Sequence, residues 1–213
     1  MTMKKIMFND KYGLTQAVLE GRKTMTRRVI SYPSKFRGQN VAGYYVCRKP
    51  SGELVEVCLH DEDERMIDAG QIFPNFQVGE VVAIAQSYKD SGYTPDSLDR
   101  HPKDLSIRGL MKDSAGWNNK MFVKSYACKH HIKITNIKVE RLQEISDDDC
   151  LKEGIFEWNA GQKDIPFYSF SYADIPDYFS PRDAFADLID KVSGKGAWES
   201  NPFVFAYEFV LVD

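Results

Sequence analysis

Apolar and polar residues alternate along much of this 213-residue chain, a pattern typical of β-strands that have one buried face. Strands are predicted where such stretches lie between turn signals. Pro, Ser and Gly at residues 50–52 form one such signal, so the two strands on either side of it should form a hairpin. The predicted strands cover residues 4–8, 24–30, 41–49, 54–60, 81–88, 120–127, 132–142 and 203–211.

Apolar residues at helical spacing occur in only a few short segments. Two of these segments begin at side chains that can accept hydrogen bonds from a first helical turn. Asn9 or Asp10 can cap the first, and Ser146 with Asp149 forms a capping box for the second. The predicted helices cover residues 10–20, 146–153 and 181–192, and residues 61–75 are expected to be partly helical.

Two strands indicate a curved sheet. In residues 132–142 the apolar phase slips at Thr135-Asn136, which predicts a β-bulge. Residues 203–211 are apolar on both faces except at Glu208, so this strand should be central and buried. The pattern predicts an α+β fold that is mainly β, a small β-barrel with peripheral helices and surface insertions. We expect one domain over residues 1–213, with an insertion at about 89–119 that is rich in Gly, Pro, Asp and Ser.

The composition fits a folded protein with a sizeable core. Hydrophobic residues make up 43% of the chain and aromatic residues 13%. No apolar run exceeds five residues, whereas a membrane-spanning helix needs about 20. The four cysteines form no CxxC pair, and the N-terminal residues do not resemble a secretory signal. We therefore expect reduced thiols and a cytoplasmic location, with no contact to a membrane.

The net charge of −3 hides an uneven distribution along the chain. Residues 1–50 hold eleven Lys or Arg and two acidic residues, a balance of +9, and the remaining residues hold 17 basic and 29 acidic residues, a balance of −12. This split indicates a local surface that faces anions. The alternative is that the two halves neutralise each other across the fold.

The basic residues are densest in the stretch from Gly21 to Arg28, which follows the first predicted helix. Strand alternation would place Thr24, Thr26 and Arg28 on one face, and Arg27 on the opposite face with its apolar neighbours. Arg28 is therefore the arginine expected to share a pocket with Thr26, and Arg27 could instead pair with the acidic C-terminal region. Such a stretch suits phosphate binding, or the activation of a hydroxyl or a water beside a lysine.

Residues 19–28, with the sequence LEGRKTMTRR, resemble the N-terminal signature of ASCH-domain proteins, which are small β-barrels related to the PUA domain of RNA-modifying enzymes. Three further segments resemble the longer phage and bacterial members of that family in the same order. Those members usually place Arg-Glu-Thr in one strand where this chain has Ala85-Gln86-Ser87, so the chain lacks that acid–base pair. The further matching segments are residues 76–80, residues 137–146 with 153–155, and residues 197–205.

The resemblance implies recognition of a nucleic acid or a nucleoside in a cleft of the barrel. Small bacterial ASCH proteins are amidohydrolases that deacetylate N4-acetylcytidine through a Lys, a Thr and a Glu. By motif position, these residues correspond to Lys23, Thr26 and Glu153 in this chain. The resemblance implies no cofactor.

The residue types themselves are compatible with this chemistry. Neighbouring arginines should make Lys23 lose its proton more easily, so that it could activate Thr26 or a water. Glu153 lies at the C-terminal end of a predicted helix, where a carboxylate is unfavourable, and it could carry a proton to a leaving amine. The alternatives are a solvated cationic turn and a surface glutamate paired with Lys152 or a distant arginine.

Several other residues are candidate ligand contacts. Arg22 and Arg28 could contact phosphates or base edges, Thr24 lies between them, and Trp158 could stack on a base. Cys128, His130 and His131 have no second pair at metal-ligand spacing, so no metal site is expected.

Three functions remain open from the sequence. The first is a module that binds RNA or a modified nucleoside in a basic, threonine-lined cleft. The second is an amidohydrolase acting on N4-acetylcytidine-like nucleosides through Lys23, Thr26 and Glu153. The third is a structural or interaction protein without catalysis.

Overall fold

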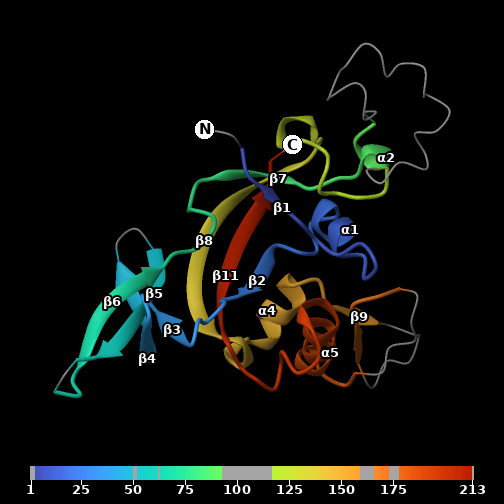
Figure 1. Cartoon of the computed structure of the whole chain (residues 1–213). Coiled ribbons are helices and arrows are strands. Elements are labelled where there is room, and N and C mark those ends of the chain that lie inside the picture. The colour runs from blue at the N-terminus through green and yellow to red at the C-terminus, as the bar shows by residue number, and fades with distance from the viewer. Residues whose placement is uncertain are drawn as a thin grey trace, which may run out of the picture.

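A curled five-stranded sheet organises the computed structural model, which describes residues 3–49, 52–61, 63–92, 117–158, 166–172 and 178–212. Its strands lie in the order β1-β7-β8-β11-β2. β1 runs parallel to β7, and every other neighbouring pair is antiparallel. Figure 1 shows the two long strands β8 and β11 curving together through the centre of the molecule. The bounds are β1 Lys5–Ile6, β7 Val81–Ile84, β8 His131–Arg141, β11 Phe203–Leu211 and β2 Met25–Val29.

The curled sheet forms a half-barrel. A second sheet of four strands, which we call the arm, projects from one side of it (Figure 1). Its strands pair in sequence order and are antiparallel throughout. The predicted hairpin is confirmed as the pairing of β4 with β5. The arm contains β3 Lys35–Phe36, β4 Gln39–Lys49, β5 Gly52–His60 and β6 Met66–Ile72, and a separate ribbon pairs β9 Phe156–Trp158 with β10 Phe167–Ser169.

Short helices lie on the opposite side of the main sheet from the arm (Figure 1). Among the described residues no helix is long and apolar enough to cross a membrane. The helical segments are α1 Leu14–Leu19, α2 Tyr88–Ser91, α4 Asp147–Lys152, α5 Pro181–Ser193 and the 3-10 turns Ser125–Ala127 and Leu142–Glu144.

The core forms where the curled sheet meets α5 and the inner face of the arm. Tyr207 in β11 and Phe185 in α5 are among its largest fully buried side chains, and Val55 brings β5 into the same cluster. β11 lies between β8 and β2, and its consecutive residues from Val204 to Tyr207 are buried, so both of its faces are covered there. This confirms that the last strand is central.

Local sequence signals are confirmed at two places that shape the sheet and its helices. Glu208 pairs with Asn136 while the next residue, Phe209, pairs with Ile134, so the predicted bulge leaves Thr135 without an opposing residue. Ser146 caps α4 as predicted, because its hydroxyl accepts a hydrogen bond from the Asp149 amide at 3.1 Å.

Other expectations are wrong. Residues 61–75 contain strand β6 instead of a helix, because pairing with β5 overrides their polar composition. Residues 120–127 form no strand but end in a 3-10 turn, and the strand predicted over 81–88 ends at Ile84. The first helix begins at Leu14, not near residue 10, because the Asn9 side chain instead accepts from the Lys11 amide in a preceding turn.

The described structure is thus α+β and mainly β, built on a half-barrel whose edge strands β1 and β2 each pair with one described neighbour. Most of the predicted insertion at 89–119 lies outside the described residues, which resume at Trp117. The four cysteines form no disulfide, and three of them are buried.

Ile134 tests how far the curved sheet depends on its buried face. Replacing this fully buried residue with alanine (Ile134→Ala) should lower the free energy of unfolding by about 2–5 kcal/mol, because it removes packed atoms from the core. Val210→Ala, on the neighbouring strand and 47% exposed, is the control and should change it little. Urea unfolding measures both; equal losses would contradict the assignment of the buried face.

Candidate functional site

The turn after α1 anchors the basic stretch against the end of α4. The Lys23 amide donates to the Ala17 carbonyl at 2.9 Å, and the Thr24 amide donates to the Lys152 carbonyl at 2.9 Å. Gly154 follows α4 with a φ of 102°, in the left-handed region that favours glycine. An added Cβ there would lie 3.5 Å from the Lys23 Cβ, so the two turns are in close contact.

Lys23 and Glu153 form a buried ion pair although they lie 130 positions apart in the sequence. The Lys23 Nζ lies 2.5 Å from Glu153 Oε2 and also donates to the Glu153 backbone carbonyl at 2.7 Å. Their side chains are only 2% and 5% exposed. The ammonium therefore neutralises the carboxylate and satisfies a carbonyl at the C-terminal end of α4.

Arg27 holds the other oxygen of the same carboxylate. Its guanidinium lies 3.1 Å from Glu153 Oε1, 2.5 Å from Glu140 on β8 and 3.0 Å from Asp149 on α4. The Arg27 side chain is fully buried. Burial acts to lower the pKa of Arg27, but Glu153 and Glu140 outweigh it and raise this pKa, so the guanidinium stays charged. Arg27 thus ties α4 to two strands of the sheet.

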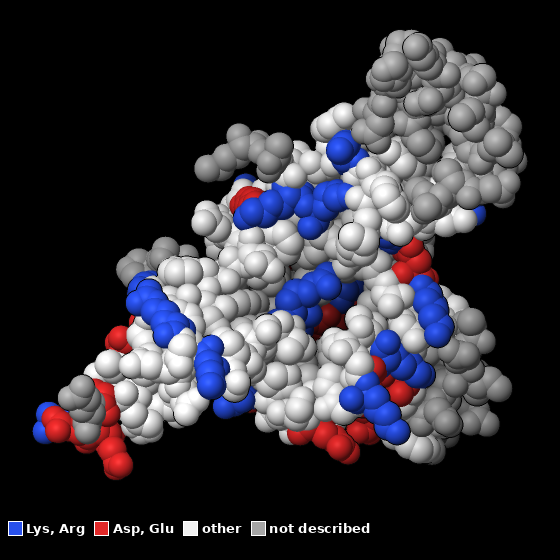
Figure 2. Space-filling model, viewed as in Figure 1, with Lys and Arg blue, Asp and Glu red and all other residues white. Residues whose placement is uncertain are grey.

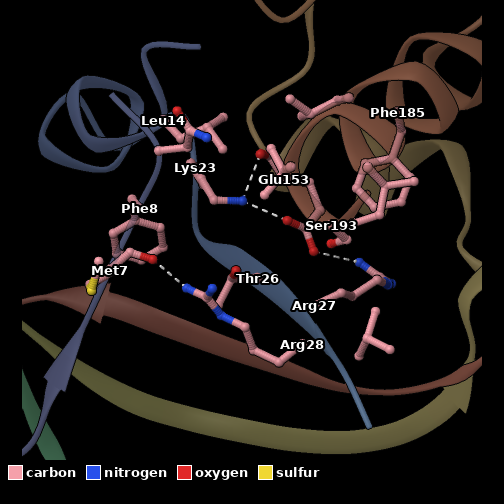
Figure 3. A pocket seen from close by; sticks show the side chains of 15 residues that line it. Met7, Phe8, Leu14, Lys23, Thr26, Arg27, Arg28, Glu153, Phe185 and Ser193 are labelled. Atoms are coloured by element: carbon pink, nitrogen blue, oxygen red, sulfur yellow. Dashed lines mark hydrogen bonds and ion pairs between the residues drawn. The ribbon is translucent and has the colours of Figure 1, made fainter. Parts of the chain in front are cut away.

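A cavity of about 130 Å³ opens beside this charge cluster. Its polar lining includes Lys23, Glu153, Thr26 and Arg28, and α5 supplies an apolar wall. Figure 3 shows these four side chains converging on one space from the turn after α1, from β2 and from the end of α4. Figure 2 shows basic side chains in a hollow on this face of the molecule.

Thr26 and Arg28 provide the free polar groups of this cavity. Thr26 is 5% exposed, and within the described part of the chain its hydroxyl hydrogen-bonds to no other residue. Arg28 uses one guanidinium nitrogen to donate to the Met7 carbonyl at 2.5 Å. Arg28 shares the cavity with Thr26, as expected from strand alternation. Arg27 also lines the cavity, although its guanidinium is held by the ion pairs.

Burial acts strongly on the cations that line the cavity. It lowers the pKa of Lys23 despite the raising effect of Glu153, and Arg28 and Arg27 lower this pKa further. Burial also lowers the pKa of Arg28. Lys23 is therefore closer to a neutral amine, and hence to a proton acceptor, than a solvent-exposed lysine.

Asp149 shows how the cations stabilise buried carboxylates. Burial, the largest influence, acts to raise the pKa of Asp149, but the hydrogen bonds and charges of Lys138 and Arg27 outweigh it and lower this pKa to about 2. Lys138 lies 2.8 Å from the Asp149 carboxylate.

The other residues proposed from the sequence do not line this cavity. Arg22 lies 2.6 Å from Glu20 and covers the rings of Phe156 and Tyr172. Trp158 adjoins the same rings with centroid distances of 6.3 Å. The Thr24 amide donates to the Lys152 carbonyl, and the Thr24 carbonyl accepts from the Phe209 amide. The described part of the chain contains no cluster of three or more His, Cys, Asp or Glu side chains that could hold a metal.

The sequence indicated that Arg27 could pair with the acidic C-terminal region, and Arg27 does pair with Glu140, Asp149 and Glu153. The individual partners were not identified, although three aspartates in the first turn of α4, of which Asp149 is buried, gave a signal. One interpretation placed Glu153 at the surface, paired with Lys152 or a distant arginine. Glu153 does pair with a distant arginine, Arg27, but it is buried and also pairs with Lys23.

Comparison of the chain with protein-family models, with curated proteins and with solved structures gives no match.

Arg27 should be essential for stability. Arg27→Met keeps much of the side-chain volume but leaves buried carboxylates short of a partner, so we expect a loss of about 3–5 kcal/mol in the free energy of unfolding. The matched variant Arg22→Met removes a partly exposed ion pair and should cost about 1 kcal/mol or less. Chemical denaturation compares the two variants. Similar losses in the free energy of unfolding would show that the Arg27 cluster stabilises the fold no more than a surface ion pair does.

The ionisation of Asp149 should make the free energy of unfolding sensitive to acid. Its pKa is lowered from 3.8 to about 2 on folding, so its contribution is complete above about pH 4 and is lost as the pH falls towards 2. The loss should be about 2 kcal/mol. Measured from pH 5 to pH 2, the free energy of unfolding should fall less steeply for Asp149→Asn than for the wild type. Parallel curves would rule out this ionisation as a source of stability.

Proposed function

We propose that this protein is an amidohydrolase that removes the acyl group from an N4-acetylcytidine-like nucleoside. One observation carries the proposal: the Lys23 ammonium lies 2.5 Å from the Glu153 carboxylate, and both line one small cavity with Thr26. The resemblance to ASCH-domain proteins, through residues 19–28 and 153–155, selects the same three residues and supports this substrate class.

The ion pair can supply both proton transfers that amide hydrolysis needs. It shares one exchangeable proton between Lys23 and Glu153. When that proton lies on Glu153, Lys23 is a free base and Glu153 a free acid at the same moment. Burial lowers the pKa of Lys23, which makes its proton easier to transfer. Arg27 holds Oε1, which leaves Oε2 to exchange the proton.

Thr26 provides the attacking oxygen or orients the attacking water. Lys23 takes the proton of the attacking group as its oxygen bonds to the acyl carbon, and Glu153 donates its proton to the nitrogen as the C–N bond breaks. If Thr26 attacks, a water then cleaves its ester. The overall reaction consumes one water and yields a carboxylic acid and an amine. A proton passing from Lys23 to Glu153 across their contact restores the starting state.

The size of the cavity suits a single ring. A cavity of about 150 Å³ can hold a benzene molecule, and this one measures about 130 Å³. One ring is therefore the most that the cavity can take, and the sugar of a nucleoside would have to lie outside it. Arg28 can donate to a carbonyl oxygen of the base or to a phosphate, since part of its guanidinium has no partner among the described residues.

Binding of RNA or a modified nucleoside without turnover is the second candidate. It is favoured by the basic hollow in Figure 2 and by the structural role of the pair, because Lys23 also satisfies a carbonyl at the end of α4. In that case Lys23, Arg28 and Thr26 would hold the ligand and no bond would break.

The test is to incubate the purified protein with N4-acetylcytidine and follow the release of cytidine and acetate. Thr26→Val preserves the side-chain shape and replaces the hydroxyl with a methyl group, so we expect the rate to fall about 100-fold or more while the melting temperature changes little. Thr24→Val, two residues away and outside the cavity, is the matched control and should keep the wild-type rate.

Two results would reject catalysis by this site. One is an unchanged rate in Thr26→Val and in Glu153→Gln. The other is no release of cytidine by a folded protein that nevertheless binds N4-acetylcytidine, which would leave binding as the function.

A further inference from the structure

A second pocket lies where the chain leaves β2 and meets the arm and β11. Its volume is about 380 Å³, larger than that of the Lys23 cavity, and it is open to solvent. We call it the aromatic pocket. It is lined by Tyr32, Gly43, Tyr44, Tyr45, Arg141 and Phe203.

Aromatic rings and one guanidinium form the walls of the aromatic pocket. The Tyr32 ring centre lies 4.7 Å from that of Tyr44 and 6.3 Å from that of Phe203. The Arg141 guanidinium lies 3.7 Å above the Phe203 ring, which is the spacing of a stacked pair. Arg141 is exposed, and one of its nitrogens donates to the Asn201 carbonyl at 3.3 Å.

These groups fit a flat ring that carries a negative charge nearby. Aromatic side chains and arginine planes are the surfaces on which unpaired bases stack. A methylated ammonium, the other common occupant of a tyrosine cluster, would be repelled by Arg141. A nucleobase whose phosphate faces the guanidinium satisfies both the rings and the charge.

The strands beside the pocket, β3 and β4, carry exposed cations and no Asp or Glu. Figure 2 shows basic side chains along the arm, with acidic side chains at its far end. Arg48 has a carboxylate partner, Glu53 at 2.9 Å. Charge complementarity therefore favours a phosphate backbone over a neutral peptide. The exposed cations of β3, β4 and their connection are Lys35, Arg37, Arg48 and Lys49.

The chain connects the aromatic pocket directly to the Lys23 cavity. Tyr32 lies six residues after Thr26, and a strand rises about 3.3 Å per residue, so at most about 20 Å separates the two positions along the backbone. A single strand of a few nucleotides can cover this distance. A free nucleoside can occupy only one of the two sites at a time.

We propose that the aromatic pocket binds an unpaired base of single-stranded RNA, and that the same strand presents its modified base to the Lys23 cavity. The presentation of a modified base to the Lys23 cavity rests on the proposed function. The binding of the strand to the aromatic pocket does not. The substrate is thus an acylated base within RNA, and the free nucleoside is a poorer substrate.

The binding test uses a fluorescent single-stranded RNA of about ten nucleotides and Thr26→Val protein, so that no turnover interferes. Arg141→Met keeps an apolar chain over Phe203 but removes the plane and the charge, and should weaken binding about tenfold. Arg65→Met removes an exposed arginine at the far end of the arm and should weaken it less than twofold. Duplex RNA of the same sequence should bind more weakly, because its bases are already stacked.

Equal losses of RNA affinity in Arg141→Met and Arg65→Met would overturn the proposal. Equal affinity for duplex and single-stranded RNA would do the same. So would displacement of the RNA by a proline-rich peptide that binds the aromatic pocket more tightly. If the RNA binds as expected but no acyl group is ever released, the aromatic pocket stands and the proposed hydrolysis fails. If N4-acetylcytidine is hydrolysed as fast free as within RNA, and Arg141→Met has no effect, hydrolysis stands and the aromatic pocket fails.

Discussion

The sharing of the Glu153 carboxylate between Lys23 and Arg27 is the interaction on which the rest of the site depends. Transferring a carboxylate from water to a protein interior costs several kcal/mol unless cations and hydrogen bonds compensate. Here each carboxylate oxygen has its own cation, at 2.5 Å and 3.1 Å. The cluster therefore has to assemble completely or not at all. This requirement fixes α4 against β2 and fixes the position of the cavity.

The fold supplies what this cluster needs. β11 lies between β8 and β2 and holds Arg27 on β2 beside Glu140 on β8. Ser146 and Gly154 set the start and the end of α4, so that Asp149 and Glu153 reach the same guanidinium. Stability and the candidate chemistry thus use the same residues. Thr26 is the exception, since its hydroxyl bonds to no described residue and is free for a substrate.

Local signals in the sequence predict the elements that carry the site. β2, β8 with its bulge at Thr135, α4 and β11 follow from alternation and capping, which act over a few neighbouring residues. β6 could not be predicted, because its polar residues form a strand only through pairing with β5. The pairing of Lys23 with Glu153 has no local signal, and only the resemblance to ASCH-domain proteins brought the two residues together. For Arg27 the sequence indicated only a pairing with the acidic C-terminal region, because ion pairs between distant segments leave no periodic trace that would identify the partners.

Whether the pair acts as an acid and a base or only as a structural bridge depends on the pKa of Lys23. Burial lowers this pKa, and catalysis by the proposed route needs a lysine that can lose its proton. The most direct measurement is an NMR titration of the Lys23 side chain in isotopically labelled protein, assigned with a Lys23→Arg variant. The account predicts a pKa clearly below the ordinary lysine value of about 10.4. A pKa at or above that value would make Lys23 a permanent cation and contradict the account.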